Sequence, residues 1–274
     1  MSTVIERPSF SELTARQQQV WSSGDYSVVA SMIHSVAERL SDDADLRAGW
    51  QVLDVATGSG NAAIAAARLG CRVTGIDYVP ELLARGRERA AAERLDVELI
   101  EGDAQSLPFA DAAFNAATSV FGVMFAADQG RAARELLRVV RPGGTIALAA
   151  WTPIGFVGEM FRLASSYAPP APGTPSPLLW GTEEGVRMLL ADGLSYLQLR
   201  ERRFVFRATS AERLAQVFAR TYGPLVRAVA AAGAVAGAEL RADLAELMER
   251  RNRLPEGGPL AISASYLEAI GTRR

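Results

Sequence analysis

The feature that most constrains this chain is an apolar run that ends in a small-residue turn and opens directly onto a helix-forming segment. The run and turn read VLDVATGSGN at residues 52–61, and AAIAAARL follows at 62–69. We expect a strand, a tight turn and a helix, in that order. Gly58 and Gly60 lack a Cβ atom, so the backbone can lie against a ligand at which the first N–H groups of the helix point. The sequence predicts a nucleotide-like ligand, although Gly-x-Gly followed by Ala63 also fits the dinucleotide fingerprint.

Composition and charge remove several classes of function. The chain has 274 residues, 49% of them hydrophobic, which is enough for one substantial core. Its net charge of -2 offers no basic surface to a nucleic acid, so we expect a small-molecule substrate. With one cysteine, Cys71, and one histidine, His34, an internal disulfide and a Cys/His metal cluster are excluded. We expect no metal, with carboxylate-only binding as the alternative left open.

The sequence also bears on location. The N-terminus lacks the apolar core of a signal peptide, and no apolar run reaches the roughly 20 residues that span a bilayer. We therefore expect a cytoplasmic protein without a membrane span, either a monomer or a homodimer.

Acidic residues follow two further predicted strands. The strand at 71–77 ends in Asp77, whose carboxylate can accept hydrogen bonds from both hydroxyl groups of a ribose. A helix over 80–94 begins with Pro80. The strand at 97–101 runs into the loop GDAQSLPF at 102–109, where Asp103 can accept a hydrogen bond from an adenine amino group. The backbone N–H of Ala104 can donate one to the same ring.

The remaining elements are expected in two groups. Strands at 114–120 and 145–151 flank an amphipathic helix at 131–140, which the Pro-Gly-Gly run at 142–144 ends. The segment 121–125 stays apolar after its strand, which favours a dry pocket over a polar loop. Farther on, we expect a proline-rich connector, two short strands, two helices and a last strand, at 168–177, 194–200, 204–206, 211–220, 224–251 and 260–270.

A helical leader over residues 10–40, broken once at 23–25, precedes the first strand. We expect it to fold over the glycine turn, which would bring Trp21 and Tyr26 to a ligand. His34 lies eight positions after Tyr26 on the same face of this expected helix. Because imidazole titrates near neutral pH, His34 is a candidate general base, and Tyr26 is a second candidate catalytic residue. Ordinary packing or structural roles are the alternative for all three side chains.

The ordered series of motifs resembles the class I S-adenosylmethionine (SAM)-dependent methyltransferases, and within them the ubiquinone and menaquinone biosynthesis branch. The resemblance covers residues 21–151 and rests on LDVATGSG, GID, GDAQSLPF and RPGG, at 53–60, 75–77, 102–109 and 141–144. It implies an α/β fold: a Rossmann-like three-layer sandwich with a seven-stranded, mostly parallel sheet, an antiparallel last strand and a helical lid insertion. The implied organisation is one domain over 1–274. It has a helical cap at 1–50, a SAM-binding core at 51–151, a connector with a sheet strand and substrate lid at 152–254, and a final strand at 255–274.

The resemblance also implies a cofactor site. The glycine turn would hold the methionine part of SAM, and Asp77 the ribose. Tyr78 or Val79 would cover one face of the adenine, and Asp103 with Ala104 its edge. The carbonyl group of Ser119 would meet the methionine ammonium. The residues expected to bind the cofactor are Asp54, Ala56, Thr57, Gly58, Ser59, Gly60, Asp77, Tyr78, Gly102, Asp103, Ala104 and Ser119.

Two positions depart from the family pattern. Ala56 stands where relatives often have glycine, which is a small change. Phe121 stands where many relatives carry a tyrosine or histidine, so no general base is assigned by the resemblance.

Together these observations predict a SAM-dependent methyltransferase that moves a methyl group by SN2 displacement to an O, N or C atom of a small, apolar or aromatic metabolite, releasing S-adenosylhomocysteine (SAH). The acceptor pocket is expected to be shaped by Trp21, Tyr26, Phe121, Met124, Trp151, Phe156, Trp180, Phe218 and Tyr222, with core packing as the alternative.

Two other functions stay open. One is a SAM-binding protein of the same fold that catalyses a cyclisation. The other is an NAD-dependent oxidoreductase, which the absence of any lysine, and so of a Tyr-x-x-x-Lys pair, disfavours.

Overall fold

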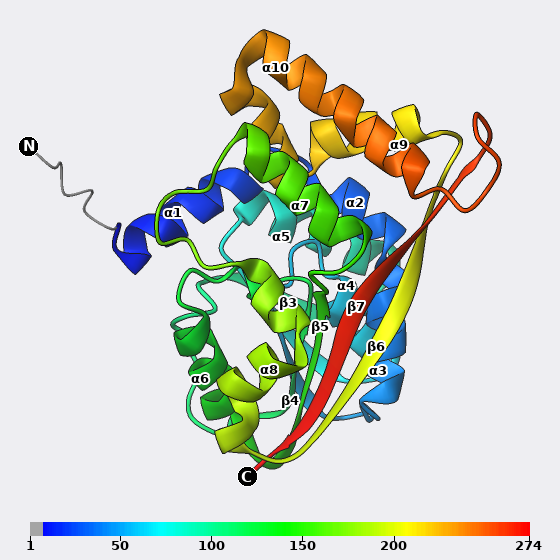
Figure 1. The fold of residues 1–274 in the computed structure, drawn as a ribbon. Helices are drawn as coiled ribbons and strands as arrows, with labels where there is room; N and C mark the ends of the chain where they lie inside the picture. Colours follow the sequence, from blue (N-terminus) through cyan, green and yellow to red (C-terminus); the bar gives the residue numbers. More distant parts are fainter. Residues whose placement is uncertain (1–7) are drawn as a thin grey trace, which may run out of the picture.

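Seven strands form one sheet in the order β3-β2-β1-β4-β5-β7-β6 (Figure 1). The computed structural model describes residues 8–274. Neighbouring strands among β1 to β5 pair in parallel, whereas β7 runs antiparallel between β5 and β6. The strands are β1 (Gln51–Val55), β2 (Arg72–Asp77), β3 (Val97–Glu101), β4 (Phe114–Val120), β5 (Val140–Trp151), β6 (Leu194–Ala208) and β7 (Leu260–Arg273). This confirms the predicted seven-stranded sheet with its antiparallel last strand.

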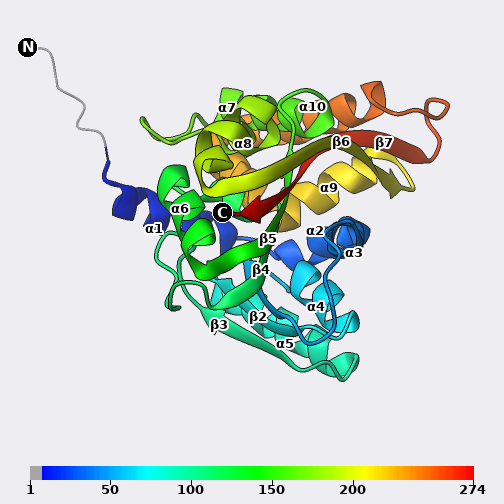
Figure 2. The same cartoon turned by 90° about the horizontal axis from the view of Figure 1, so that it is seen from below.

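Helices cover both faces of the sheet and make the outer layers of the sandwich (Figure 2). One face carries α3 (His34–Asp43), α4 (Asn61–Arg68) and α5 (Pro80–Ala92), and the other carries α6 (Gln129–Val139) and α8 (Glu183–Leu190). Because both faces are covered, β1 and β4 are buried along nearly their whole length, and they read as apolar runs without strict alternation. No helix separates β3 from β4 in the part of the chain that the structure describes, so a loop over 102–113 joins them.

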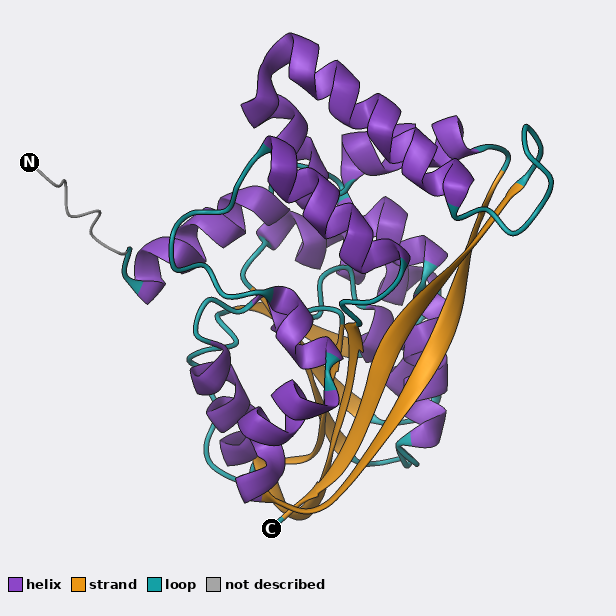
Figure 3. Cartoon of the chain, viewed as in Figure 1, coloured by secondary structure: helices purple, strands orange, loops and turns teal. Residues whose placement is uncertain are grey.

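A second set of helices gathers beyond the carboxyl ends of the parallel strands (Figures 1 and 3). The set comprises α1 (Phe10–Trp21), α2 (Tyr26–Met32), α7 (Phe156–Tyr167), α9 (Ala211–Thr221) and α10 (Gly223–Arg250). Helices α7 and α8 were not predicted from the sequence. Strand β6 is one continuous strand, whereas two short strands were predicted at 194–200 and 204–206.

The expectation of one break in the N-terminal leader is wrong, because the structure has two. Ile33 takes φ -108° and ψ 11°, which ends α2 and starts α3. Its side chain is fully buried, so the chain bends here to keep Ile33 in the core. His34 therefore begins a new helix and does not share a helix face with Tyr26.

The helix α10 has the length that was predicted from the sequence, and its bounds differ by one residue at each end. By length and mean hydropathy alone it would be able to cross a bilayer, and it is the one helix within residues 8–274 that passes this test. It is bent at Gly233, where φ is 80°, and it packs on α7 and α9. Its second part buries Leu240, Leu244 and Met248, as a helix packed in a folded domain does. No clear membrane span follows from this feature.

The strand order reverses between β1 and β4, which are neighbours in the sheet but not in sequence. In open α/β sheets the loops that leave the carboxyl ends at such a point separate and form a crevice. Here Ala56 leaves β1 and Gly122 follows β4. A Cβ atom at position 122 would collide with the carbonyl oxygen of Ala56, so only glycine lets the two loops approach this closely.

Candidate cofactor and acceptor site

A cavity lies at this reversal point, at the carboxyl ends of β1 to β4. Its empty volume, including space open to solvent, is about 740 Å³. The lining residues are Trp21, Tyr26, Ala30, Ala56, Thr57, Gly58, Ser59, Asn61, Asp77, Tyr78, Leu82, Gly102, Asp103, Ala104, Val120, Phe121, Gly122, Val123, Phe125 and Ala126. The fold thus brings the glycine turn, the acid at the end of β2 and the loop after β3 around one space, with two aromatic residues from the leader.

Asp77 is a buried acid that faces this cavity. Its Oδ2 accepts a hydrogen bond from the N–H of Gly58 at 2.8 Å, and its Oδ1 accepts one from the N–H of Val79 at 2.9 Å. Burial raises the pKa of Asp77 to about 6, against the effect of these backbone hydrogen bonds. Carboxylate oxygens can accept more than one hydrogen bond each, so both keep capacity for ligand hydroxyl groups.

Of the two candidates for the adenine face, only Tyr78 lines the cavity. Val79 is buried in the core and contributes its backbone N–H to Asp77. Burial and the neighbouring Asp77 and Asp103 carboxylates raise the pKa of Tyr78, so its hydroxyl group is neutral at physiological pH.

Asp54 supports the glycine turn and does not line the cavity. Its carboxylate accepts hydrogen bonds from the hydroxyl groups of Thr57 at 2.6 Å and Thr118 at 3.0 Å, and from the N–H of Ala63 at 3.0 Å. Burial raises the pKa of Asp54 to about 6. Gly60 also lies outside the lining; it takes a left-handed conformation, with φ 83°, that starts α4. Asp54 and Gly60 therefore fix the shape of the turn without lining the cavity.

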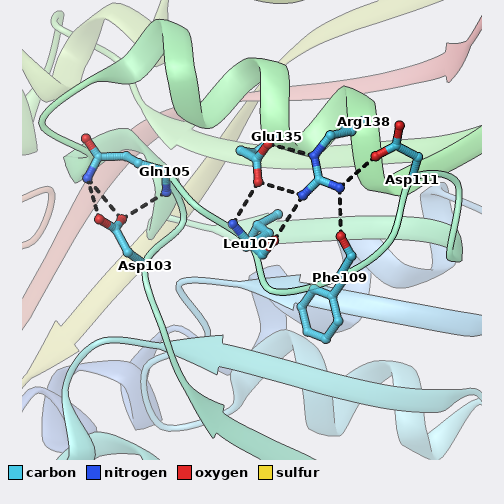
Figure 4. A network of polar contacts seen from close by, with 7 residues as sticks. All are labelled: Asp103, Gln105, Leu107, Phe109, Asp111, Glu135 and Arg138. Atoms are coloured by element: carbon cyan, nitrogen blue, oxygen red, sulfur yellow. Dashed lines mark hydrogen bonds and ion pairs between the residues drawn. The ribbon is translucent and has the colours of Figure 1, made fainter.

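The loop after β3 is held in place by two sets of hydrogen bonds (Figure 4). The side-chain amide of Gln105 donates to both carboxylate oxygens of Asp103 at 2.9 Å, and its backbone N–H donates to Oδ1 at 2.9 Å. Farther along the loop, the guanidinium of Arg138 donates to the carbonyl oxygens of Leu107 at 3.0 Å and Phe109 at 2.7 Å. Asp103 is therefore presented to the cavity by a fixed loop.

Aromatic rings line another part of the cavity wall, in two layers, and Tyr26 among them also lies beside the glycine turn. Trp21, Tyr26, Phe121 and Phe125 line the space itself. Behind them, Trp151 stacks on Phe121 with 3.8 Å between ring centroids and an angle of 2° between the planes. Edge-to-face contacts join Trp21 to Tyr26 at 5.3 Å and to Phe125 at 4.7 Å.

Six residues predicted to shape the acceptor pocket are not among the residues that line this cavity. They are Met124, Trp151, Phe156, Trp180, Phe218 and Tyr222, each at most 5% exposed. Their bulk serves packing instead: the ring of Phe206 on β6 lies 5.6 to 6.0 Å from those of Trp151, Phe156 and Phe218. Because large aromatic side chains are buried both in pocket walls and in cores, a sequence cannot separate the two layers.

Ser119 and His34 also lie outside the lining. The hydroxyl group of Ser119 donates to the carbonyl of Val55 at 2.7 Å and accepts from the N–H of Val123 at 2.9 Å, so it ties the ends of β1 and β4 together. His34 is exposed, and its Nδ1 lies 2.8 Å from the carbonyl oxygen of Ser31. The structure thus places the candidate general base away from the cavity.

Tyr26, the second candidate catalytic residue, lies at the glycine turn. A Cβ atom built at Gly58 would be 3.8 Å from Cδ1 of Tyr26. Burial and the nearby Asp77 carboxylate raise the pKa of Tyr26 well above its ordinary value. Its hydroxyl group is therefore protonated at neutral pH and suits hydrogen bonding better than proton abstraction.

Sequence reasoning missed several lining residues, among them Asn61 and Phe125. Asn61 directly follows Gly-Ser-Gly as the first residue of α4, and it lines the cavity. Phe125 belongs to the apolar segment after β4 that already indicated a dry pocket. Within residues 8–274, no three His, Cys, Asp or Glu side chains form a group that would hold a metal ion.

Comparison with known proteins identifies the family. A family model described as a methyltransferase domain matches residues 53–148. An uncharacterized protein of Mycobacterium tuberculosis is 41% identical over 240 residues, which cover 86% of this chain and 88% of that protein. A demethylmenaquinone methyltransferase of Deinococcus radiodurans is 39% identical over 127 residues, covering 45% of this chain and 53% of that enzyme. The crystal structure of the YcgJ protein from Bacillus subtilis shares the fold, with a TM-score of 0.60 and 18% identity, covering 88% of this chain and 99% of that one.

The region that the methyltransferase model matches begins in β1 and ends in β5. It therefore contains the glycine turn, Asp77 and the loop that carries Asp103, which are the polar parts of the cavity. The chain belongs to the class I SAM-dependent methyltransferases, with SAM as its cofactor, and over 127 residues, 45% of its length, it resembles a demethylmenaquinone methyltransferase.

Proposed function

We propose that this chain transfers the methyl group of SAM to an oxygen, nitrogen or carbon atom of a small, neutral, apolar or aromatic metabolite. The observation that carries this proposal is the division of one cavity into a polar end and an aromatic end. A donor and an acceptor of different chemistry can meet in such a space, one at each end.

The polar end suits the cofactor residue by residue. The glycine turn would hold the methionine part of SAM, Asp77 the ribose hydroxyl groups, and Tyr78 a face of the adenine. Asp103 would accept from the adenine amino group, and the N–H of Ala104 would donate to the ring. This assignment leaves the reactive methyl group between the turn and the aromatic end, where electron-rich ring faces favour a positively charged sulfonium.

The aromatic end selects the acceptor. Among the lining residues, the side chains that carry charge are Asp77 and Asp103, both at the nucleotide end. An anionic acceptor placed against Trp21, Phe121 and Phe125 would lose its hydration without gaining a partner, which is costly. A neutral planar acceptor would instead gain about 0.5–1.5 kcal/mol for each ring that it packs against.

The reaction itself asks little of the protein. A lone pair or carbanion of the acceptor forms a bond to the methyl carbon while the carbon–sulfur bond breaks and its electron pair stays on sulfur, which releases SAH. The proton of an O–H, N–H or C–H acceptor is lost to water, before the transfer for a phenolate or carbanion and after it for an amine. Holding donor and acceptor in line can supply about 7–11 kcal/mol of the barrier. The protonated hydroxyl group of Tyr26 is available as a hydrogen-bond donor that orients an acceptor oxygen or nitrogen.

The test is an acceptor screen with the purified full-length chain and SAM, read out as SAH by mass spectrometry. The panel pairs neutral phenols, quinols and aromatic amines with carboxylated analogues of the same size. We expect SAH with neutral members and little with their anionic partners. Conversion of an acceptor without consumption of SAM would contradict methyl transfer and favour the cyclisation alternative, and a preference for anionic acceptors would contradict the assignment of the aromatic end.

The expected cytoplasmic location and the monomeric or homodimeric state stay predictions. Size-exclusion chromatography with light scattering would decide the oligomeric state directly.

A further inference from the structure

Arg89 is a half-buried cation at the cofactor turn that the proposed function does not use. It lies on α5, and its Nη1 donates to the carbonyl oxygen of Ser59 at 2.6 Å and to Oδ1 of Asn61 at 2.9 Å. The hydroxyl oxygen of Ser59 is 3.2 Å from the same nitrogen. Ser59 and Asn61 line the cavity, whereas Arg89 does not. Arg89 therefore contacts two residues that line the cavity without lining it itself.

A glycine on α5 lets the guanidinium reach the turn. Gly86 precedes Arg89 by three residues and so lies on the same helix face. A Cβ atom at Gly86 would be 3.3 Å from the carbonyl carbon of Ser59, which is a tight contact, and 2.7 Å from Cδ1 of Leu99, whose side chain would have to move. Gly86 therefore lets α5 pack closely on the turn, and Arg89 on the same helix face supplies the hydrogen-bond donor.

The Ser59 carbonyl needs this donor. The first hydrogen bond of α4 runs from the N–H of Ile64 to the carbonyl of Gly60 at 2.8 Å, so the helix leaves the preceding carbonyl unused. Ser59 is 1% exposed, and a buried carbonyl without a partner costs free energy. By accepting from Arg89, the Ser59 carbonyl is held toward α5, which fixes the peptide plane between the two glycines of the turn.

Asn61 extends the constraint to α2. Its Nδ2 donates to the carbonyl oxygen of Ala30 at 2.8 Å. A guanidinium can only donate and a backbone carbonyl can only accept, so the orientation of the Asn61 amide is set by its two neighbours. Ala30 belongs to the helix that begins at Tyr26. One line of hydrogen bonds therefore runs from α5 through the turn to the helix that carries Tyr26.

We propose that Arg89 is a positioning residue for the cofactor: through Ser59 it fixes the glycine turn, and through Asn61 it holds α2 and Tyr26 over that turn. The inference rests on the proposed role of the turn in binding the methionine part of SAM. Loss of Arg89 therefore weakens cofactor binding and loosens α2, although the side chain does not touch the ligand.

The first test is calorimetric titration of the full chain with SAH. Arg89→Met keeps the aliphatic stem but removes the donors, and we expect the Kd for SAH to rise about tenfold. Arg89→Lys keeps a donor and the charge and is expected to recover part of the affinity. Arg85→Met is the matched control, because Arg85 lies on the same helix in an exposed pair with Glu88 and should leave the Kd unchanged.

The second test measures the coupling to α2, which a merely structural arginine would not show. In amide hydrogen exchange with SAH present, Arg89→Met and Asn61→Ala are both expected to speed exchange in residues 26–32 while α6 keeps its protection. In the double variant, the effect of Arg89→Met on the Kd is expected to shrink, because one of its partners is already gone.

The outcomes are distinguishable. Wild-type affinity in Arg89→Met, or unchanged exchange over residues 26–32, would overturn the positioning role. Full additivity of the two substitutions would overturn the path through Asn61. If Arg89→Met does not fold, Arg89→Lys and Asn61→Ala carry the same two readouts. Failure of the wild-type chain to bind SAH would instead refute the proposed function.

Discussion

The two ends of the cavity are built in opposite ways. At the cofactor end, Asp77 and the glycine turn directly follow parallel strands, and backbone hydrogen bonds fix their places. At the acceptor end, rings from α1, β5 and the start of α10 meet through stacking and edge contacts, as when Trp21 meets Tyr222 at 5.5 Å. The polar end should therefore control ligand affinity with little effect on folding, and the aromatic end should contribute strongly to folding with little effect on cofactor affinity. Each prediction below tests this contrast.

The largest expected effect is on stability, at the aromatic end. Trp151→Ala removes a ring that stacks on Phe121 and leaves a cavity, so the free energy of unfolding should fall by about 3–5 kcal/mol. The Kd for SAH should stay within about threefold of wild type under conditions where the variant is folded, because Trp151 does not line the cavity. Urea denaturation and calorimetry measure the two quantities. A large loss of SAH affinity in folded Trp151→Ala would break the contrast.

The converse substitution is Asp77→Ala at the polar end. Hydrogen bonds to a charged acceptor are worth about 1.5–3 kcal/mol each, so the Kd for SAH should rise tenfold or more. The free energy of unfolding at pH 7 should fall less than in Trp151→Ala, because burial already disfavours this carboxylate in its charged form. Asp77→Asn keeps the size and shape of the side chain but removes its charge, so comparing it with Asp77→Ala separates the effect of lost charge from the effect of lost volume. Unchanged SAH affinity in both variants would mean that the ribose is bound elsewhere.

A smaller effect is expected from Arg138→Met, which acts on the loop behind Asp103. Arg138 pairs with Glu135 at 2.7 Å and donates to two loop carbonyls, so its loss should cost about 1–3 kcal/mol of stability. SAH affinity should fall only a few-fold, since Arg138 does not line the cavity. Arg141→Met, at an exposed site on β5, is the control for removing a positive charge. A loss of affinity as large as that of Asp77→Ala would show that this loop contributes as much to cofactor binding as Asp77 does.

The pH dependence should separate binding from folding. Asp77 has a pKa raised from 3.8 to about 6, so lowering the pH through 6 protonates it, and SAH affinity should fall about tenfold between pH 7 and pH 5. The free energy of unfolding changes with pH in the opposite direction to the SAH affinity. Between pH 4 and 6 the folded state binds more protons at Asp77 than the unfolded state does, so this group makes the unliganded protein less stable as the pH rises. Asp54 adds a change of the same sign. In Asp77→Asn the pH dependence of binding should flatten, and a profile identical to wild type would contradict the assignment.

The smallest effect is expected at His34. Its side chain is exposed and lies outside the cavity, so His34→Ala should change the free energy of unfolding by less than about 0.5 kcal/mol. Once an acceptor is known, the pH profile of methyl transfer should also be unchanged. Loss of an ionisation near neutral pH in this variant would restore His34 as the general base.

The same contrast explains what could be predicted from the sequence. The five parallel strands and the place of Asp77 follow from local signals, since an apolar run, a glycine turn and an acid at a strand end each depend on a few neighbouring residues. The bend at Ile33, which separates His34 from Tyr26, depends on burying Ile33 in the core and leaves no glycine or proline in the sequence. Likewise, whether Phe121 or Trp151 lines the cavity depends on how β4, β5 and β7 pack, which no local pattern records. Arg89 was missed because its partner is a backbone carbonyl on another element.

The most direct test of the central claim, that the glycine turn, Asp77 and the loop after β3 form the SAM site, is parallel calorimetric titration of the full-length chain with SAM, SAH and NAD. The account predicts one site per chain with micromolar affinity for SAM and SAH, and no heat of binding with NAD. Binding of NAD without SAM or SAH would mean that the turn and both acids serve a different nucleotide, and the proposed methyl transfer would be refuted.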